Sequence, residues 1–147
     1  MAAVALDTNV LVYAFLDPQT NKGTRAAEIV RRAGAGGLIA AQVLSELLSV
    51  TRRKDPALLS EAAGWLRQLA TSYAVVNTDL EVLLKAAGIA QRYRIQMFDS
   101  VICAASIKGG GTVLLSEEMQ DGQRITGLRI LNPFAPGNQA EVEALLA

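Results

Sequence analysis

The 147-residue chain contains no histidine and only one cysteine. Without histidine, catalysis by Ser-His-Asp or Cys-His pairs is excluded, and so are zinc sites built on imidazole. The single Cys103 cannot form an internal disulfide or a four-thiolate metal site, which is typical of an intracellular protein. No run of 18 apolar residues occurs, and the apolar first sixteen residues lack a basic start and include Asp7 and Asn9. We therefore expect a cytoplasmic protein with no membrane span and no signal peptide.

Charged residues are also scarce, at 19%, whereas 51% of the residues are hydrophobic and the mean hydropathy is +0.27. A chain of this composition buries a large core and is not disordered. Its length suits one domain, covering residues 1–147.

The charges that are present are unevenly distributed although the net charge is zero. Residues 21–54 carry seven basic side chains against two acidic ones, a local balance of +5, and residues 110–147 carry two against five, a balance of −3. One interpretation is two ordinary solvated helix faces. The other is a basic surface for a polyanion beside an acidic centre.

Short apolar runs alternate with helical patterns along the chain. Strands are expected at residues 4–7, 38–40, 73–76, 113–115 and 129–131. Helices are expected at residues 10–16, 24–33, 42–54, 56–70, 80–93 and 99–108, with a short terminal helix capped at 138–141. Asp55, a capping box at residues 78–81, and Asp99 are the expected N-terminal caps of three of these helices. Strands alternating with helices predict a parallel α/β sandwich.

Two glycine-rich segments, at residues 34–37 and 109–111, each follow a predicted helix. A phosphate-binding loop needs lysine and Ser or Thr after its glycines, and a dinucleotide fingerprint needs GxGxxG between strand and helix. Neither pattern is present, so these glycines are expected to end helices.

Acidic residues gather where open parallel sheets place their functional groups, beyond the carboxyl ends of strands. Asp7 ends the first predicted strand, Asp99 begins the sixth helix, and Glu117 and Glu118 follow residues 113–115. Glu46 lies at the edge of the apolar stripe of its helix. Each acid alone has a structural explanation as a helix cap, a boundary residue or a polar loop residue. Their convergence does not, because clustered carboxylates destabilise a fold unless they are separated, protonated or bridged by a cation.

Such a carboxylate cluster suits Mg²⁺, with Mn²⁺ as a substitute, because both ions prefer oxygen ligands. A metal held there can polarise a phosphodiester and lower the pKa of a bound water. In a chain without histidine, that water is the most available nucleophile.

Four segments, in order along the chain, resemble the PIN domain, in particular the VapC-like toxins of bacterial toxin–antitoxin pairs. They are AVALDTNVLVYAF at 3–15, SELLSV around Glu46, FDSVICAAS at 98–106 and VLLSEEMQDGQRITGLRILNPF at 113–134. The resemblance spans nearly the whole chain. Haloacid-dehalogenase-type phosphatases have a similar opening but need a second aspartate two residues after the first, where this chain has Asn9.

The resemblance implies a three-layer α/β/α sandwich around a parallel sheet and an Mg²⁺- or Mn²⁺-dependent endoribonuclease, the toxin of a type II toxin–antitoxin module. Such toxins are silenced by a cognate antitoxin and are commonly homodimers. Asp7, Glu46 and Asp99 match three of the family's acidic positions. The fourth is Glu118, where aspartate is usual, with Asp121 as a substitute. Polar residues beside these acids match at Thr8, Asn9 and Ser116.

Several assignments remain open at this stage. The candidate contacts to RNA, or to an acidic antitoxin segment, are Arg25, Arg31, Arg32, Arg52 and Arg53. Cys103 is expected to be buried packing, and Trp65 belongs either to the core or to an oligomer contact. The glutamate at 118 favours an alternative, a PIN-fold module that binds RNA or protein without cutting, and a second alternative is a small-molecule phosphatase that uses Asp7 as nucleophile. The target RNA is not predicted, because it depends on surface shape and base stacking, for which the chain has only three Phe, three Tyr and one Trp.

Overall fold

The computed structural model describes residues 3–147, in which six strands form one sheet with the order β3-β2-β1-β4-β6-β5. All neighbouring strands are parallel except β5 and β6, which form an antiparallel pair. The strands are β1 (Val4–Leu6), β2 (Leu38–Ala40), β3 (Ala74–Val76), β4 (Val113–Leu115), β5 (Arg124–Ile125) and β6 (Leu128–Leu131).

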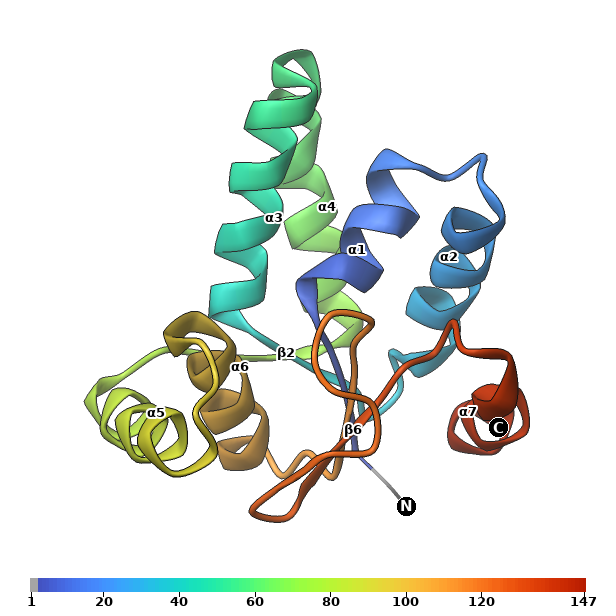
Figure 1. The fold of residues 1–147 in the computed structure, drawn as a ribbon. Coiled ribbons are helices and arrows are strands. Elements are labelled where there is room, and N and C mark those ends of the chain that lie inside the picture. Colours follow the sequence, from blue (N-terminus) through green and yellow to red (C-terminus); the bar gives the residue numbers. More distant parts are fainter. Residues whose placement is uncertain (1–2) are drawn as a thin grey trace.

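Helices cover both sides of this sheet. They are α1 (Thr8–Leu16), α2 (Asn21–Ala33), α3 (Ala41–Lys54), α4 (Leu59–Ser72), α5 (Leu80–Tyr93), α6 (Met97–Lys108) and α7 (Gln139–Leu146). Figure 1 shows α5 and α6 on one side of the sheet and α1, α2 and α7 on the other, while α3 and α4 project from the edge where β1 and β2 end. The predicted α/β sandwich is confirmed. None of the helices described in residues 3–147 combines the length and apolarity that crossing a membrane requires.

The core forms where the apolar strands meet helix α6. Every residue of β1, β2 and β4 is buried, as expected for strands covered on both faces. Helix α6 is buried from Ser100 to Ser106, and these two hydroxyls donate to the carbonyls of Gln96 and Ile102 one turn earlier. Cys103 is fully buried in the same helix, which confirms the expectation that it packs in the core.

Three predicted helix caps are wrong: nearby residues cap α6 and α5 instead, and no side chain caps α4. Helix α6 begins at Met97, with Gln96 Oε1 accepting the Asp99 N–H at 2.9 Å, so Asp99 lies inside the first turn and is not the cap. Helix α5 is capped by Asp79, which accepts from the Val82 N–H at 2.9 Å. The side chain of Asp55 makes no cap bond, and a 3-10 turn (Pro56–Leu58) precedes α4.

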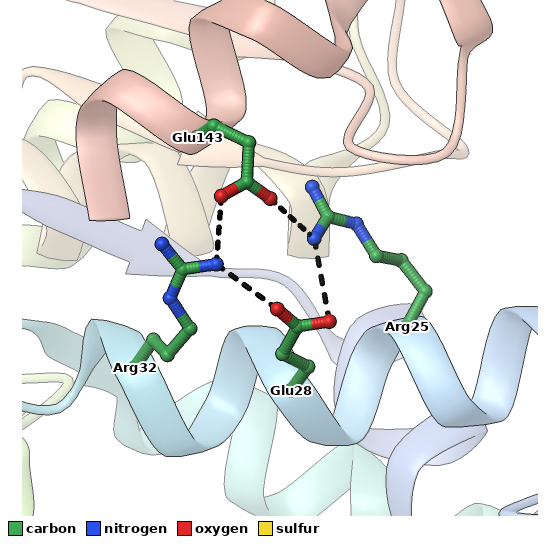
Figure 2. A network of polar contacts seen from close by, with 4 residues as sticks. All are labelled: Arg25, Glu28, Arg32 and Glu143. Carbon is green, nitrogen blue, oxygen red and sulfur yellow. Dashed lines mark hydrogen bonds and ion pairs between the residues drawn. The ribbon is translucent and has the colours of Figure 1, made fainter. Parts of the chain in front are cut away.

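Helix α7 is held against α2 by the four-residue network shown in Figure 2. Glu143 of α7 pairs with Arg25 and with Arg32 of α2, each at 2.8 Å. Glu28 joins the same guanidinium groups at 3.6 and 3.0 Å. Two further nitrogens of Arg25 are buried with no hydrogen-bond partner in residues 3–147, so Glu143 compensates an arginine that is largely removed from water.

Replacing Glu143 with glutamine is expected to lower the melting temperature at neutral pH and to have little effect in acid. Hydrogen bonds from Arg32 and then Arg25 hold the pKa of Glu143 below its ordinary value of 4.5. A lowered pKa contributes stability above the ordinary value and loses it as the pH falls through the folded-state pKa. Thermal unfolding of wild type, E143Q and the exposed control E61Q between pH 7 and pH 3 tests this. A wild-type advantage over E143Q that stayed constant across this range would contradict it.

Candidate acidic active site

The order of the sheet reverses between β1 and β4. From β1 the chain proceeds outward through β2 and β3, and it then returns to place β4 on the other side of β1. Ligands of open α/β sheets bind at this kind of switch point, outside the carboxyl ends of the strands. Asp7 follows β1 and Ser116 follows β4, so both residues lie at the switch point.

Asp7 is a buried carboxylate held by several hydrogen bonds. It caps α1, where its Oδ1 accepts the Thr8 N–H at 2.7 Å. Its Oδ2 accepts from the Ser116 hydroxyl at 2.7 Å and from the Asn9 amide at 3.3 Å. These hydrogen bonds hold the side chain in one orientation. The residue is only 3% exposed.

The environment of Asp7 nevertheless opposes its negative charge. The pKa of Asp7 is raised from 3.8 to about 6. Burial raises it most, the hydrogen bonds from Ser116 and Thr8 partly offset this increase, and the nearby carboxylates of Asp99 and Glu46 add to it. Asp7 thus caps helix α1, as the sequence suggested, and also belongs to an acidic cluster.

Glu46 extends from α3 toward the start of α1. Its Oε1 accepts from the Thr8 hydroxyl at 3.1 Å, and its Oε2 accepts from the Gln42 amide at 3.0 Å. Thr8 therefore joins Asp7 to Glu46, with its backbone N–H on the first and its hydroxyl on the second.

Asp99 and Glu118 complete the cluster from α6 and from the loop after β4. Asp99 is half-buried and Glu118 is exposed. Burial raises the pKa of Asp99, and the carboxylates of Glu46 and Glu118 raise it further. Asp99 is therefore within electrostatic range of each of the other three carboxylates, Asp7, Glu46 and Glu118.

Three cavities adjoin at Glu118, which lines all of them. The first, of 580 Å³, also contains Glu46 and Asp99, together with Gln42, Ser45, Ser49, Gln96 and Phe98. The second, of 330 Å³, is lined by Glu46 and by Arg53 and Lys54 at the end of α3. The third, of 270 Å³, is lined by Asp99 and by Arg94 after α5. We call the first of these the central cavity.

Two other acids of the late segment are placed outside this cluster. Glu117 accepts from the Tyr13 hydroxyl and from Lys22, each at 2.5 Å. Asp121 accepts from the Asn132 N–H at 2.8 Å and from the Asn138 amide at 3.1 and 3.2 Å. Of the two candidates for the fourth acid, the structure places Glu118 beside Asp99 and Asp121 away from it.

The five candidate arginines are dispersed over the molecule. Arg53 lines the second cavity, and Arg52 is its exposed neighbour on α3. Arg25 and Arg32 belong to the network that holds α7. Arg31 lines a separate cavity of 360 Å³ between α1, α2 and α4, beside Phe15, which itself stacks on the half-buried Trp65 with ring centroids 4.9 Å apart.

The residues of the three cavities that sequence reasoning missed include Gln42, Arg94, Gln96 and Phe98. Gln42 lies one helical turn before Glu46, and Phe98 is adjacent to Asp99, so spacing from the acids would have indicated both. Arg94 has a left-handed conformation, with φ of 56°. This conformation is uncommon outside glycine, and nothing in the local sequence indicates it.

The chemistry of the cluster fits a hard divalent cation. Its four carboxylates supply oxygen ligands, and within residues 3–147 no ion pair joins any of them to a lysine or arginine. In the same residues no group of three or more acidic, cysteine or histidine side chains lies close enough together to hold a metal ion. A divalent cation bound here would therefore be held by one or two carboxylates, with water completing its shell.

Comparisons with known proteins agree with this geometry. The family model described as the PIN domain matches residues 4–120. No curated protein matches the sequence significantly.

Similar solved structures include VapC20 of Mycobacterium tuberculosis, a Sarcin-Ricin loop cleaving toxin, at 15% identity and a TM-score of 0.67, covering 79% of this chain and 90% of that one. A toxin–antitoxin complex from Klebsiella pneumoniae is similar at 14% identity and a TM-score of 0.67, with 90% and 98% covered. VapBC2 from Rickettsia felis, bound to a DNA fragment from its promoter, is similar at 16% identity and a TM-score of 0.64, with 88% and 98% covered. At these identities the likeness establishes the fold.

Proposed function

Because this chain belongs to the PIN domain family, we propose that it is a metal-dependent endoribonuclease and the toxin of a type II toxin–antitoxin module. The observation that carries the proposal is the gathering of Asp7, Glu46, Asp99 and Glu118 at the switch point of the sheet, with no cationic side chain paired to them in residues 3–147. The proposed cofactor is Mg²⁺, with Mn²⁺ as a substitute.

Each member of the cluster has a proposed role. Asp7, Asp99 and Glu118 would hold the cation directly or through water, and a cation bound there would supply charge neutralisation at the phosphate and a more acidic water. Glu46, held by Thr8 and Gln42, is positioned to orient the attacking water. Asn9 and Ser116 donate hydrogen bonds that hold the Asp7 carboxylate in place. In-line attack would leave a 5′-phosphate and a 3′-hydroxyl.

The proposed partners are an RNA substrate and a cognate antitoxin. We propose that the protein itself is a cytoplasmic homodimer. The proposal of an antitoxin is supported by the similar solved structures, several of which are toxin–antitoxin complexes of other proteins. The RNA backbone would be contacted by the basic residues at the end of α3, Arg52, Arg53 and Lys54. Two of them, Arg53 and Lys54, line the second cavity beside Glu46 and Glu118.

The decisive experiment uses protein purified without a partner and incubated with a structured RNA mixture in Mg²⁺, Mn²⁺ or EDTA. We expect cleavage that requires the metal, and we expect Mg²⁺ to raise the melting temperature of wild type but not of D7N. RNA retained in a gel shift without shortening would instead favour a non-cleaving module, the alternative that the glutamate at 118 motivates. Turnover of an aryl phosphate would favour a phosphatase.

Replacing Glu118 with glutamine is expected to lower the cleavage rate by roughly 10- to 100-fold, in the range for supporting residues of a metal site. D121N is the matched control and should stay close to wild type, because Asp121 binds Asn132 and Asn138 outside the cluster. Initial rates on a labelled RNA under saturating Mn²⁺ measure both. If D121N lost activity while E118Q kept it, the assignment of the fourth acid would be reversed.

A further inference from the structure

Phe98 is an exposed aromatic side chain beside the acidic cluster. It is 55% exposed and lines the central cavity together with Glu46, Asp99 and Glu118. It lies in the first turn of α6, whose following residues from Ser100 onward are buried in the core. A single exposed apolar residue is ordinary on a protein surface. The position of this one, next to Asp99, is what requires an explanation.

The other aromatic residues near the acids already have partners. Tyr13 donates to Glu117 and packs edge-on against Phe134, with ring centroids 5.2 Å apart. The Tyr93 hydroxyl accepts the Thr126 N–H at 3.0 Å, and Arg92 lies over its ring. Among the described residues that line the central cavity, Phe98 is the only aromatic one, and its ring is therefore available to a ligand.

The remaining lining of the central cavity is polar and uncharged. Gln42, Ser45, Ser49 and Gln96 add amide and hydroxyl groups to the lining of this cavity. Gln96 uses its Oε1 to cap α6, which leaves its amide N–H groups to donate to a ligand. Ser45 donates to the Ala41 carbonyl at 3.3 Å, so its oxygen can still accept. An aromatic face bordered by neutral donors and acceptors matches the faces and edges of a nucleobase.

Building on the proposed ribonuclease activity, we propose that Phe98 stacks on an unpaired base of the RNA next to the phosphodiester that is cut. The cavity volume of 580 Å³ lies within the range of roughly 300–1,000 Å³ typical of ligand sites. The basic residues lie in the two neighbouring cavities, with Arg53 and Lys54 in one and Arg94 in the other. The sugar-phosphate chain would pass along these residues while the base enters the central cavity.

A nucleic acid fits this site better than an apolar protein surface does. The central cavity contains three carboxylates, and covering them with an apolar partner would remove them from water without compensation. A bound RNA leaves the site hydrated and brings the phosphate that the proposed reaction requires. The proposed occupant is therefore a single-stranded RNA segment.

The test compares F98A and F98L with F98Y and F98W. Since stacking requires a π-face, we expect F98A and F98L to raise KM by roughly 5- to 100-fold, the equivalent of one base–aromatic stack, with kcat nearly unchanged. F98Y and F98W should remain close to wild type. L84A, which truncates a residue that is 66% exposed on α5, is the control for losing apolar surface. If F98L behaved like F98Y, stacking would be disproved.

A second measurement reports on the base itself. For RNA carrying 2-aminopurine on either side of the cleavage site, the 2-aminopurine fluorescence should be quenched on binding wild type and F98Y. It should not be quenched on binding F98A or F98L. Quenching that was retained on binding F98A would overturn the proposal. So would a molar mass of the F98A variant in solution that differed from that of wild type, because it would mark Phe98 as a subunit contact. Normal cleavage by F98L would refute the stacking role and leave the nuclease proposal intact. Phe98-dependent quenching without cleavage by wild type would support stacking and refute the nuclease.

Discussion

Replacing Asp99 with asparagine is expected to lower the rate of RNA cleavage by roughly a thousandfold, the upper end of the range for removing a group that stabilises transition-state charge. Asp99 lies between Glu46 and Glu118, and both raise its pKa. Its carboxylate also lines two of the three cavities. Since the Asp99 backbone N–H, rather than its side chain, bonds to the cap residue Gln96, asparagine retains the local fold. Initial rates on labelled RNA in Mn²⁺ measure the loss.

The interpretation of that loss depends on two controls. E117Q changes an acid of the neighbouring loop that is already paired with Lys22 and Tyr13, and its activity should fall far less than that of D99N. Circular dichroism of D99N should match wild type, with a small gain of stability at neutral pH because burial, Glu46 and Glu118 raise the pKa of the Asp99 carboxyl. Cleavage by D99N at the wild-type rate would remove Asp99 from the proposed site.

Replacing Asp7 with asparagine is expected to stabilise the protein while removing its activity. At pH 7 the ionised Asp7 is buried and faces two other carboxylates, which together with burial raise its pKa from 3.8 to about 6. A shift of about two units corresponds to roughly 3 kcal/mol against the charged form. Asparagine is neutral but weakens the bonds from Ser116 and Asn9, which offsets about 1 kcal/mol. The net gain of about 2 kcal/mol predicts a melting temperature higher by roughly 4–8 °C.

The pH dependence of this gain provides its own check. A carboxyl group with a raised pKa contributes its full stability below the ordinary value and loses it as the pH rises through the folded-state pKa. The advantage of D7N should therefore be largest at pH 7 and shrink between pH 6 and pH 4. Differential scanning calorimetry in EDTA measures it, with the exposed D55N as a control that should change little. A melting temperature of D7N below that of wild type at pH 7 would mean that the hydrogen bonds outweigh the buried charge.

If D99N loses activity and D7N loses activity while gaining stability, the acidic cluster lowers the stability of the folded protein and is kept for its function. Buried charges in mutual repulsion are unfavourable for folding, and functional sites commonly contain such strain. The same carboxylates that would lower the stability of the free protein would favour binding of a divalent cation, which explains why both effects should disappear together in D7N.

The fold class was predictable from the sequence because its signals are local and periodic. Continuous apolar runs such as residues 113–115 are typical of strands covered on both faces, and the amphipathic segments between them are typical of the covering helices. The strand β5 was missed because its two residues carry no such pattern. Helix starts were less predictable, since Gln96 and Asp79 serve as caps in place of the expected Asp99 and Thr78.

The sequence by itself determined which acids were candidates, because Asp7, Asp99 and Glu118 follow strands or begin helices and Glu46 lies at the edge of an apolar stripe. Only the tertiary structure decided their grouping. It places Glu118 beside Asp99, turns Asp121 toward Asn138, and joins Asp7 to Glu46 through Thr8. It also separates Arg53, in a cavity at the cluster, from Arg25 and Arg32, which hold α7. Local pattern indicates the conformation of each segment, whereas contacts between residues 17 to 118 positions apart depend on how those segments pack together.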